Sequence, residues 1–129
     1  MIWKTNGEAV TTAVDVLLIE DEPSIAQAVG FILSREGWRC SEWPEGRGAM
    51  ERIRLLQPRL VILDVMLPGR SGGEILADLR ADKHLASLPV LLLSARGLAN
   101  LPTGADRTLT KPFANDELRQ AVRELLAPT

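Results

Sequence analysis

Leu60-Val61-Ile62-Leu63-Asp64-Val65-Met66-Leu67-Pro68-Gly69 is the stretch that decides how this chain folds. Four consecutive aliphatic residues lead directly into an aspartate, and Pro68 and Gly69 then end the apolar run. A run of this kind is typical of a strand buried on both faces, as in a parallel sheet covered by helices. Asp64 then lies at the carboxyl end of the strand, the edge where open α/β sheets bind ligands. Aspartate is also common in turns, so this position alone leaves ligand binding and turn formation open.

Four further segments are predicted strands, namely residues 14–19, 38–43, 88–93 and 107–110. Apolar residues at helical spacing predict a helix in each of the first three connections and a last helix after the fifth strand, capped by Asn115. Strands that alternate with helices across short connections indicate an α/β fold. We therefore expect a doubly wound, five-stranded parallel sheet with helices on both faces.

The connection between the fourth and fifth strands breaks this alternation. Residues 96–104 include Gly97, Pro102 and Gly104, and glycine and proline both disfavour a helix interior. The fourth helix is therefore expected to be shortened or absent.

The length of 129 residues is enough for one domain with a single core. Residues 1–12 are mixed and aperiodic, with Asn6-Gly7 as a turn signal, so residues 1–13 are expected to be an N-terminal extension. Residues 14–127 then form the domain.

The composition excludes several classes of protein. Lys and Arg number 15 against 17 Asp and Glu, so the chain has no basic excess, and we expect no direct nucleic-acid partner. The single cysteine, Cys40, rules out an internal disulfide and a thiolate metal cluster, and fits a reducing compartment. No apolar stretch reaches the roughly 20 residues that span a bilayer, and the N-terminus lacks an export signal. The expectation is a soluble, cytoplasmic protein without a membrane partner.

Polar residues follow several of the predicted strands. Glu20, Asp21 and Glu22 follow the first strand, Ser94 the fourth and Lys111 the fifth, so all lie at one edge of the sheet with Asp64. Two unit charges about 4 Å apart repel by roughly 4 kcal/mol at a partly wet site, so clustered acids call for a positive partner. Acids also complement the dipole at a helix N-terminus, and both explanations can hold together. Carboxylates, a hydroxyl and an ammonium suit Mg²⁺ and a phosphoryl group.

Four motifs occur in a fixed order: Glu20-Asp21, Leu63-Asp64-Val65-Met66-Leu67-Pro68-Gly69, Ser94-Ala95-Arg96, and Gly104-Ala105-Asp106 through Lys111-Pro112-Phe113. Together they resemble the receiver domain of bacterial two-component response regulators, over residues 14–127. The resemblance implies a flavodoxin-like sheet with strand order 2-1-3-4-5.

The resemblance also implies roles for the residues at the sheet edge. Asp64 would accept a phosphoryl group from the phosphohistidine of a sensor histidine kinase or a histidine phosphotransfer protein, or from a small phosphodonor. Ser94 and Lys111 would bond the phosphoryl oxygens, with a cis Lys111-Pro112 bond aiming the lysine. The chain would be a switch that recruits a downstream protein partner, and it would catalyse only its own phosphorylation and dephosphorylation.

The metal of this family is Mg²⁺, and the resemblance implies its ligands. Glu20, Asp21 and Asp64 would supply carboxylate oxygens, and Met66 its backbone carbonyl. These roles agree with the chemistry of a carboxylate nucleophile assisted by a metal and an ammonium.

Two departures from the family pattern concern the output of the switch. Thr108 stands three residues before Lys111, where receivers usually have an aromatic residue that moves together with the hydroxyl at Ser94. The fourth-helix region is also short. The given sequence ends at Thr129, so we expect a stand-alone receiver, with a fragment of a longer regulator as the alternative.

Two alternative functions remain to be weighed. A phosphatase with an aspartate nucleophile would need a second aspartate two residues later, where this chain has Met66. A phosphorylation-independent receiver that only binds proteins would usually lack an acid or the lysine, and this chain keeps them all.

Overall fold

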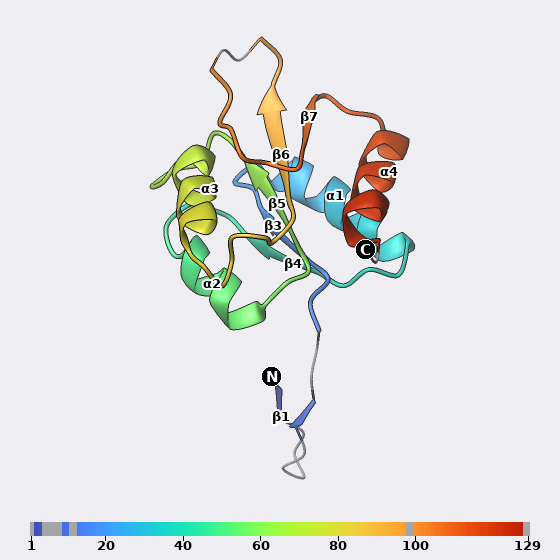
Figure 1. Ribbon diagram of the computed structural model, residues 1–129. Coiled ribbons are helices and arrows are strands. Elements are labelled where there is room, and N and C mark those ends of the chain that lie inside the picture. Colours follow the sequence, from blue (N-terminus) through green and yellow to red (C-terminus); the bar gives the residue numbers. More distant parts are fainter. Residues whose placement is uncertain (1, 4–8, 11–12, 98–99, 128–129) are drawn as a thin grey trace.

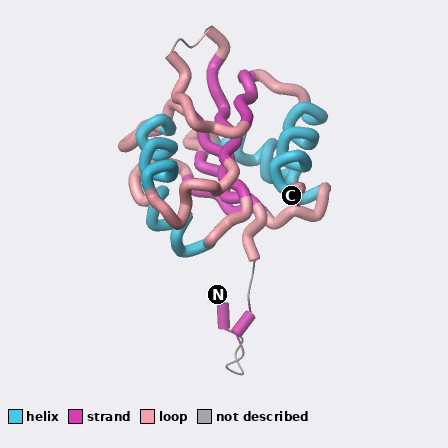
Figure 2. Tube along the Cα trace, in the orientation of Figure 1, coloured by secondary structure: helices cyan, strands magenta, loops and turns pink. Residues whose placement is uncertain are grey.

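The computed structural model describes residues 2–3, 9–10, 13–97 and 100–127. These residues form seven strands and four helices, which Figure 1 labels and Figure 2 colours by type. The strands are β1 (Ile2–Trp3), β2 (Ala9–Val10), β3 (Val16–Ile19), β4 (Cys40–Trp43), β5 (Leu60–Asp64), β6 (Val90–Ala95) and β7 (Arg107–Lys111). The helices are α1 (Pro23–Arg35), α2 (Ala49–Leu56), α3 (Gly72–Ala81) and α4 (Asn115–Leu126).

A five-stranded sheet forms the centre of the domain. Its strands run in the order β4-β3-β5-β6-β7, and every neighbouring pair is parallel. Numbered within this sheet alone, the order is 2-1-3-4-5, so the predicted doubly wound, flavodoxin-like sheet is confirmed. Figure 1 shows α2 and α3 on one face of the sheet and α1 and α4 on the other. The predicted covering of both faces is therefore confirmed as well.

The central strand β5 accounts for the apolar run that ends at Asp64. Leu60 and Ile62 pack into the core under α1 and α4, whereas Val61 and Leu63 pack into the core under α2 and α3. Alternate residues of a strand face opposite sides, so a strand covered on both sides needs an aliphatic residue at each position. Each such side chain contributes about 1.5–3 kcal/mol when it is fully buried.

The last helix begins one residue earlier than the sequence indicated. Ala114 occupies the N-cap position, and Asn115 is the first helical residue, so the prediction that Asn115 caps α4 was wrong. The side chain of Glu117 reaches back and accepts a hydrogen bond from the Ala114 backbone N–H at 2.8 Å. Glu117, the third residue of the helix, thus satisfies the N–H of the N-cap residue, whereas an Asn115 cap would have accepted from an N–H two or three residues after it.

The connection between β6 and β7 contains no helix among its described residues, 96–97 and 100–106, as the sequence predicted. Residues 98–99 of the predicted loop lie outside the described part of the chain. Residues 102–106, which we call the strap, run along α3 instead. A Cβ atom built on Gly73, in the first turn of α3, would lie 3.1 Å from Pro102 Cγ, so the two segments are in close contact.

The strap continues along α3 to its last turn. Gly104 has φ +104°, and a Cβ atom placed there would lie 3.5 Å from Arg80 Cγ and 3.9 Å from Leu76 Cγ. Ala105 packs against the core under α2 and α3. An extended segment therefore covers part of the face where the sequence pattern had left room for a fourth helix.

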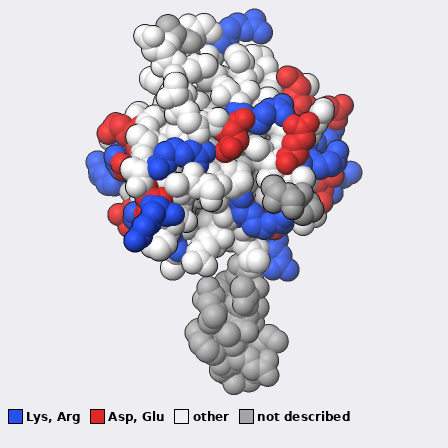
Figure 3. All heavy atoms as spheres, viewed as in Figure 1, with Lys and Arg blue, Asp and Glu red and all other residues white. Residues whose placement is uncertain are grey.

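The N-terminal residues include a short separate sheet, in which β1 pairs antiparallel with β2. The Asn6-Gly7 turn and most of the predicted extension lie outside the described residues, so the domain boundary at residues 13 and 14 stays a proposal. None of the described helices has the length and apolar composition needed to cross a membrane. Figure 3 shows basic and acidic side chains interspersed on the visible face of the domain.

The close contact between α3 and the end of β5 gives a prediction about stability. A methyl group on Gly72 would overlap the Asp64 carbonyl oxygen, which is backbone and cannot rotate away. Gly72→Ala should therefore lower the free energy of unfolding by about 2 kcal/mol or more, measured by urea denaturation. Gly30→Ala is the control, because its nearest neighbour is Glu42 Oε2 at 3.6 Å and alanine favours the interior of α1. Equal stability of the two variants would contradict the prediction.

Candidate functional site

The register of the sheet aligns the carboxyl ends of its central strands. Ile19 pairs with Leu63 across β3 and β5, and Glu20 and Asp64 are the next residues of their strands. Asp64 in turn pairs with Leu93 on β6. The carboxyl ends of β3, β5 and β6 therefore lie side by side at one edge of the sheet. Glu20, Asp21 and Asp64, the acids predicted from the sequence, lie together at this edge.

Three carboxylates form a cluster at this edge. Glu20, Asp21 and Asp64 each offer a carboxylate oxygen, and these oxygens lie within 4.8 Å of one another. Glu20 and Asp64 are buried, while Asp21 is exposed to solvent. The site therefore has two acids fixed by the core and a third at its rim.

Lys111 provides the positive partner that the clustered acids require. Its ammonium Nζ lies 3.2 Å from Glu20 Oε1 and 3.2 Å from Asp64 Oδ2. The other Asp64 oxygen, Oδ1, accepts a hydrogen bond from the Met66 backbone N–H at 3.2 Å. Both oxygens of Asp64 are thus held by the protein, and the Lys111–Pro112 peptide bond is cis, as expected.

The pKa values of Glu20 and Lys111 are both raised. The rise favours the neutral form of the glutamate and the charged form of the lysine. Burial, and after it the neighbouring Asp64, raise the pKa of Glu20, Lys111 lowers it, and together they place it at about 7. Burial alone would lower the pKa of Lys111, but the charges of Asp64 and Glu20 outweigh it, and its pKa is raised. Lys111 is therefore charged at neutral pH, whereas Glu20 holds a proton over part of the range below it.

The donor set fits a hard divalent cation. Three carboxylates share the site with one ammonium, so negative charge is in excess, and all the side-chain donors are oxygens of the kind that Mg²⁺ prefers. Met66 lies two residues beyond Asp64 at the same edge, and its side chain points to solvent with 64% exposure. A ligand role for its backbone carbonyl stays a prediction.

Ser94 and Thr108 lie at different distances from this edge. Ser94 is buried and directly follows Leu93, the register partner of Asp64, so it stands beside the carboxylate cluster. Thr108 is exposed and pairs with Leu92, two residues before Ser94 on β6. The structure thus brings Ser94 to the site and leaves Thr108 outside it, on the strand that leads to Lys111.

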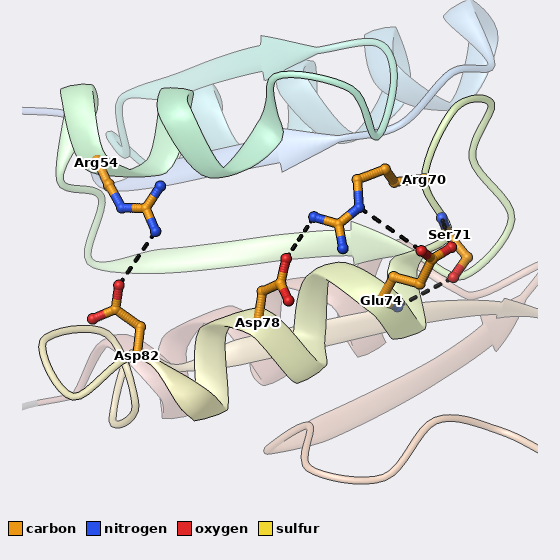
Figure 4. Close-up of polar contacts among 6 residues, drawn as sticks. All are labelled: Arg54, Arg70, Ser71, Glu74, Asp78 and Asp82. Carbon is orange, nitrogen blue, oxygen red and sulfur yellow. Dashed lines mark hydrogen bonds and ion pairs between the residues drawn. The ribbon is translucent and has the colours of Figure 1, made fainter.

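The loop after Asp64 is held by contacts that the sequence analysis missed. Arg70 pairs with Asp78 on α3, and Ser71 and Glu74 form a reciprocal capping box at the start of that helix, as Figure 4 shows. The pattern Ser-x-x-Glu before a helix is a known capping signal and could have revealed the second contact. The Gly46 N–H also donates to the Pro68 carbonyl at 3.0 Å, which fixes the middle of the loop.

Comparison with known proteins gives consistent matches. A sequence model of the response regulator receiver domain matches residues 16–123. The chain is 38% identical to the "Probable transcriptional regulatory protein TcrX" of Mycobacterium tuberculosis, over 98% of this chain and 53% of TcrX. It is 34% identical to the phosphate regulon transcriptional regulatory protein PhoB of Escherichia coli, over 86% of this chain and 51% of PhoB. The chain therefore spans about half the length of these curated relatives.

A solved structure agrees with the sequence matches. The signal receiver domain of a signal transduction histidine kinase from Syntrophus aciditrophicus aligns with a TM-score of 0.81 and 31% identity. The alignment covers 88% of this chain and 90% of that one.

The raised pKa of Glu20 predicts a pH dependence of stability in metal-free protein. In the unfolded chain Glu20 loses its proton near its ordinary pKa of 4.5, whereas the folded chain keeps it to about pH 7. The folded state then binds more protons between these values, so the free energy of unfolding falls as pH rises from 4.5 to 7. Glu20→Gln should remove this part of the fall, on the order of 1 kcal/mol or more, in urea denaturation with a chelator present.

The exposed neighbour provides the control for this measurement. Glu22→Gln should keep the pH dependence of the unmodified chain, because Glu22 lies outside the buried pair. If Glu20→Gln and the unmodified chain show the same pH dependence, Glu20 does not hold the extra proton.

Proposed function

This chain belongs to the response regulator receiver family, and from that premise we propose that it is a phosphoacceptor switch of a two-component signalling system, with Asp64 as the acceptor. The observation that carries the proposal is the arrangement around Asp64. A buried carboxylate stands within 4.8 Å of two further acids, and its Oδ2 contacts the Lys111 ammonium at 3.2 Å. Few structural roles would explain three acids and a lysine gathered at the ligand-binding edge of a parallel sheet.

The proposed reaction is an in-line transfer to Asp64. A carboxylate oxygen of Asp64 attacks the phosphorus atom of a phosphohistidine, and a new O–P bond forms as the P–N bond breaks. The leaving nitrogen keeps the electron pair of that bond, and because the other ring nitrogen of the donor carries a proton, the group leaves as a neutral imidazole. Lys111 and the Ser94 hydroxyl bond the phosphoryl oxygens and offset their charge, so neither residue has to form a covalent bond.

The metal of the proposal is Mg²⁺, held by Glu20, Asp21, Asp64 and the backbone carbonyl of Met66. When bound, Mg²⁺ supplies positive charge that offsets the repulsion between Asp64 and an anionic phosphodonor. The three carboxylates support this assignment, because the described chain gathers oxygen donors from β3 and β5 at one point.

The proposed donor is a sensor histidine kinase or a histidine phosphotransfer protein, and the phosphorylated domain then acts on a downstream protein partner. We propose that this domain contacts neither nucleic acid nor membrane and works in the cytoplasm. The support for the absence of a nucleic-acid partner is that the whole chain has 15 basic and 17 acidic residues and therefore no basic excess. The curated relatives named as transcriptional regulators are about twice as long, so their further activities are not carried over.

The chain is proposed to catalyse only its own phosphorylation and dephosphorylation. A receiver that binds proteins without phosphorylation is the alternative, and the complete set of Glu20, Asp21, Asp64, Ser94 and Lys111 argues against it. The contacts of Lys111 with two of these acids support the same conclusion.

Labelling with a small phosphodonor tests the proposal. Acetyl phosphate or phosphoramidate should add one phosphoryl group in the presence of Mg²⁺ and none with a chelator, because the carboxylates otherwise repel the donor. Intact mass before and after treatment is the measurement. Persistent labelling in Asp64→Asn would show that the acceptor has been assigned to the wrong residue.

The same assay separates a metal ligand from a nearby surface acid. Asp21→Asn should raise the Mg²⁺ concentration needed for half-maximal labelling by about tenfold, because a carboxylate ligand is lost. Glu22→Gln is the matched control, since Glu22 is exposed and its side chain accepts a hydrogen bond from Ser24 at 3.2 Å. Equal effects would mean that Asp21 is not a ligand.

The output of the switch is proposed to run through the loop after β6. Thr108 is too small to act as a moving aromatic side chain, and Ser94 leads directly into residues 96–101. Among the described residues of that loop, the amides of 96, 97, 100 and 101 donate no hydrogen bond to the backbone of another described residue. We therefore infer that phosphorylation changes the order of this loop.

Hydrogen exchange tests this proposal for the loop. The amides of residues 96, 97, 100 and 101 should exchange quickly in the unmodified chain and gain protection when Asp64 is phosphorylated. The amides of β5 serve as an internal control, because they lie in the centre of the sheet in both states. Strong protection of the loop before phosphorylation would contradict the proposal.

A further inference from the structure

Arg80 makes a set of contacts that the site and the proposed function do not use. It lies in the last turn of α3, and its side chain is 25% exposed. Its guanidinium donates from Nε to the Gly104 carbonyl at 2.8 Å, from Nη1 to the carbonyls of Ala86 at 3.0 Å and Leu88 at 2.8 Å, and from Nη2 to Asp106 Oδ2 at 3.0 Å. One side chain thus joins α3, the segment before β6 and the strap before β7.

Asp106 extends this cluster into the sheet. Its Oδ2 also accepts a hydrogen bond from the Val90 N–H at 2.8 Å, and its own N–H donates to the Val90 carbonyl at 3.0 Å. Val90 is the first residue of β6, and Asp106 directly precedes β7. Both backbone polar groups of Val90 are therefore bonded to the residue that immediately precedes the neighbouring strand.

These bonds set the register of β7 against β6. From this starting point Leu91 pairs with Arg107, Ser94 with Thr110 and Ala95 with Lys111. A shift of one residue would turn every side chain of β7 to the opposite face of the sheet. Lys111 would then no longer point to Asp64, although the acids on β3 and β5 would keep their places.

The connection from the carboxyl end of β6 to the start of β7 gives β7 little further support among the described residues. The described residues that follow β6 form no helix, so no regular element ties the end of β6 to the start of β7. β7 is also an edge strand, bonded to the sheet on one side only. The contacts at Arg80 and Asp106 are thus the fixed point from which the five residues of β7 reach the site.

We propose that Arg80 and Asp106 act as a positioning pair for phosphoryl transfer, by holding β7 in the register that places Lys111 on Asp64. The inference rests on the proposed function of Asp64. Arginine suits the role because its planar fork serves several acceptors at once, while a lysine ammonium is a single point with three donors. The pair touches no metal ligand, so it acts on the phosphoryl-binding half of the site alone.

The test compares two properties of the full chain, the rate of phosphorylation by acetyl phosphate and the affinity for Mg²⁺ alone. Arg80→Lys should lower the rate by about 10- to 100-fold, because a displacement of about 1 Å of a reacting group has effects of this size. Its Mg²⁺ affinity should not weaken by more than about twofold, because the carboxylates lie on β3 and β5. Both are measured well below the unfolding midpoint of each variant.

Arg54→Lys is the matched control. Arg54 also pairs with an acid of the same region, Asp82 at 3.3 Å, but it bonds neither β6 nor the strap (Figure 4). It should keep both properties of the unmodified chain. Asp106→Asn should lower the rate in the same direction as Arg80→Lys, and the double variant should be no slower than the slower single variant, because both changes release the same contact.

Three outcomes would overturn the inference. These are an unchanged rate in Arg80→Lys and Asp106→Asn, an equal loss of rate and Mg²⁺ affinity, or an equal loss of rate in Arg54→Lys. Asp106→Asn carries the test if Arg80→Lys does not fold.

A second readout keeps this inference separate from the proposed function. If the unmodified chain takes no phosphoryl group, the proposed function fails, but the register can still be measured by hydrogen exchange. The amides of β7 should then exchange at least about tenfold faster in Asp106→Asn than in Arg54→Lys, since the fixed point of the strand is lost. Equal exchange in the two variants would overturn the positioning role.

Discussion

The Lys111 ammonium between Glu20 and Asp64 is the contact on which the rest of the site depends. Two carboxylates that follow buried strands cannot both remain ionised without a positive partner, since burying an unpaired charge costs several kcal/mol. The partner comes from the edge strand, 91 residues after Glu20. A surplus of negative charge remains at the rim, where Asp21 is exposed, and this surplus suits the site to a divalent cation.

The acids and their positive partner come from different strands of the sheet. β3 and β5 carry the acids and lie in the interior of the sheet, where neighbours on both sides fix them. β6 and β7 carry Ser94 and Lys111, and β7 has a neighbour on one side only. The acids are therefore placed by the core itself, whereas the lysine depends on the contacts that hold an edge strand. A substitution that disturbs the core would therefore displace the acids and the lysine, whereas one that disturbs the strap would displace the lysine alone.

Much of the site could be predicted because its signals are local. The apolar run into Asp64 defines a strand and its carboxyl end, and parallel strands bring Glu20, Ser94 and Lys111 to the same edge. That the described residues between β6 and β7 contain no helix also followed from Gly97, Pro102 and Gly104. The cap of α4 was missed because Asn115 and Glu117 compete for the same helix start, and side-chain geometry decides between them. Arg80 was missed because three of its acceptors are backbone carbonyls, which leave no pattern in the sequence.

The described residues between β6 and β7 form no helix, and this bears on the proposed output of the switch. A helix between β6 and β7 would connect Ser94 to the surface through its own hydrogen bonds and would also hold the start of β7. In this chain different residues of the connection follow Ser94 and hold the start of β7. The strap is bonded to α3 through Arg80, while residues 96, 97, 100 and 101, which follow β6, have no backbone hydrogen bonds to other described residues. Under the proposed function, the residues that follow β6 can therefore change their order while the register of β7 stays fixed, so that this change need not withdraw Lys111 from Asp64.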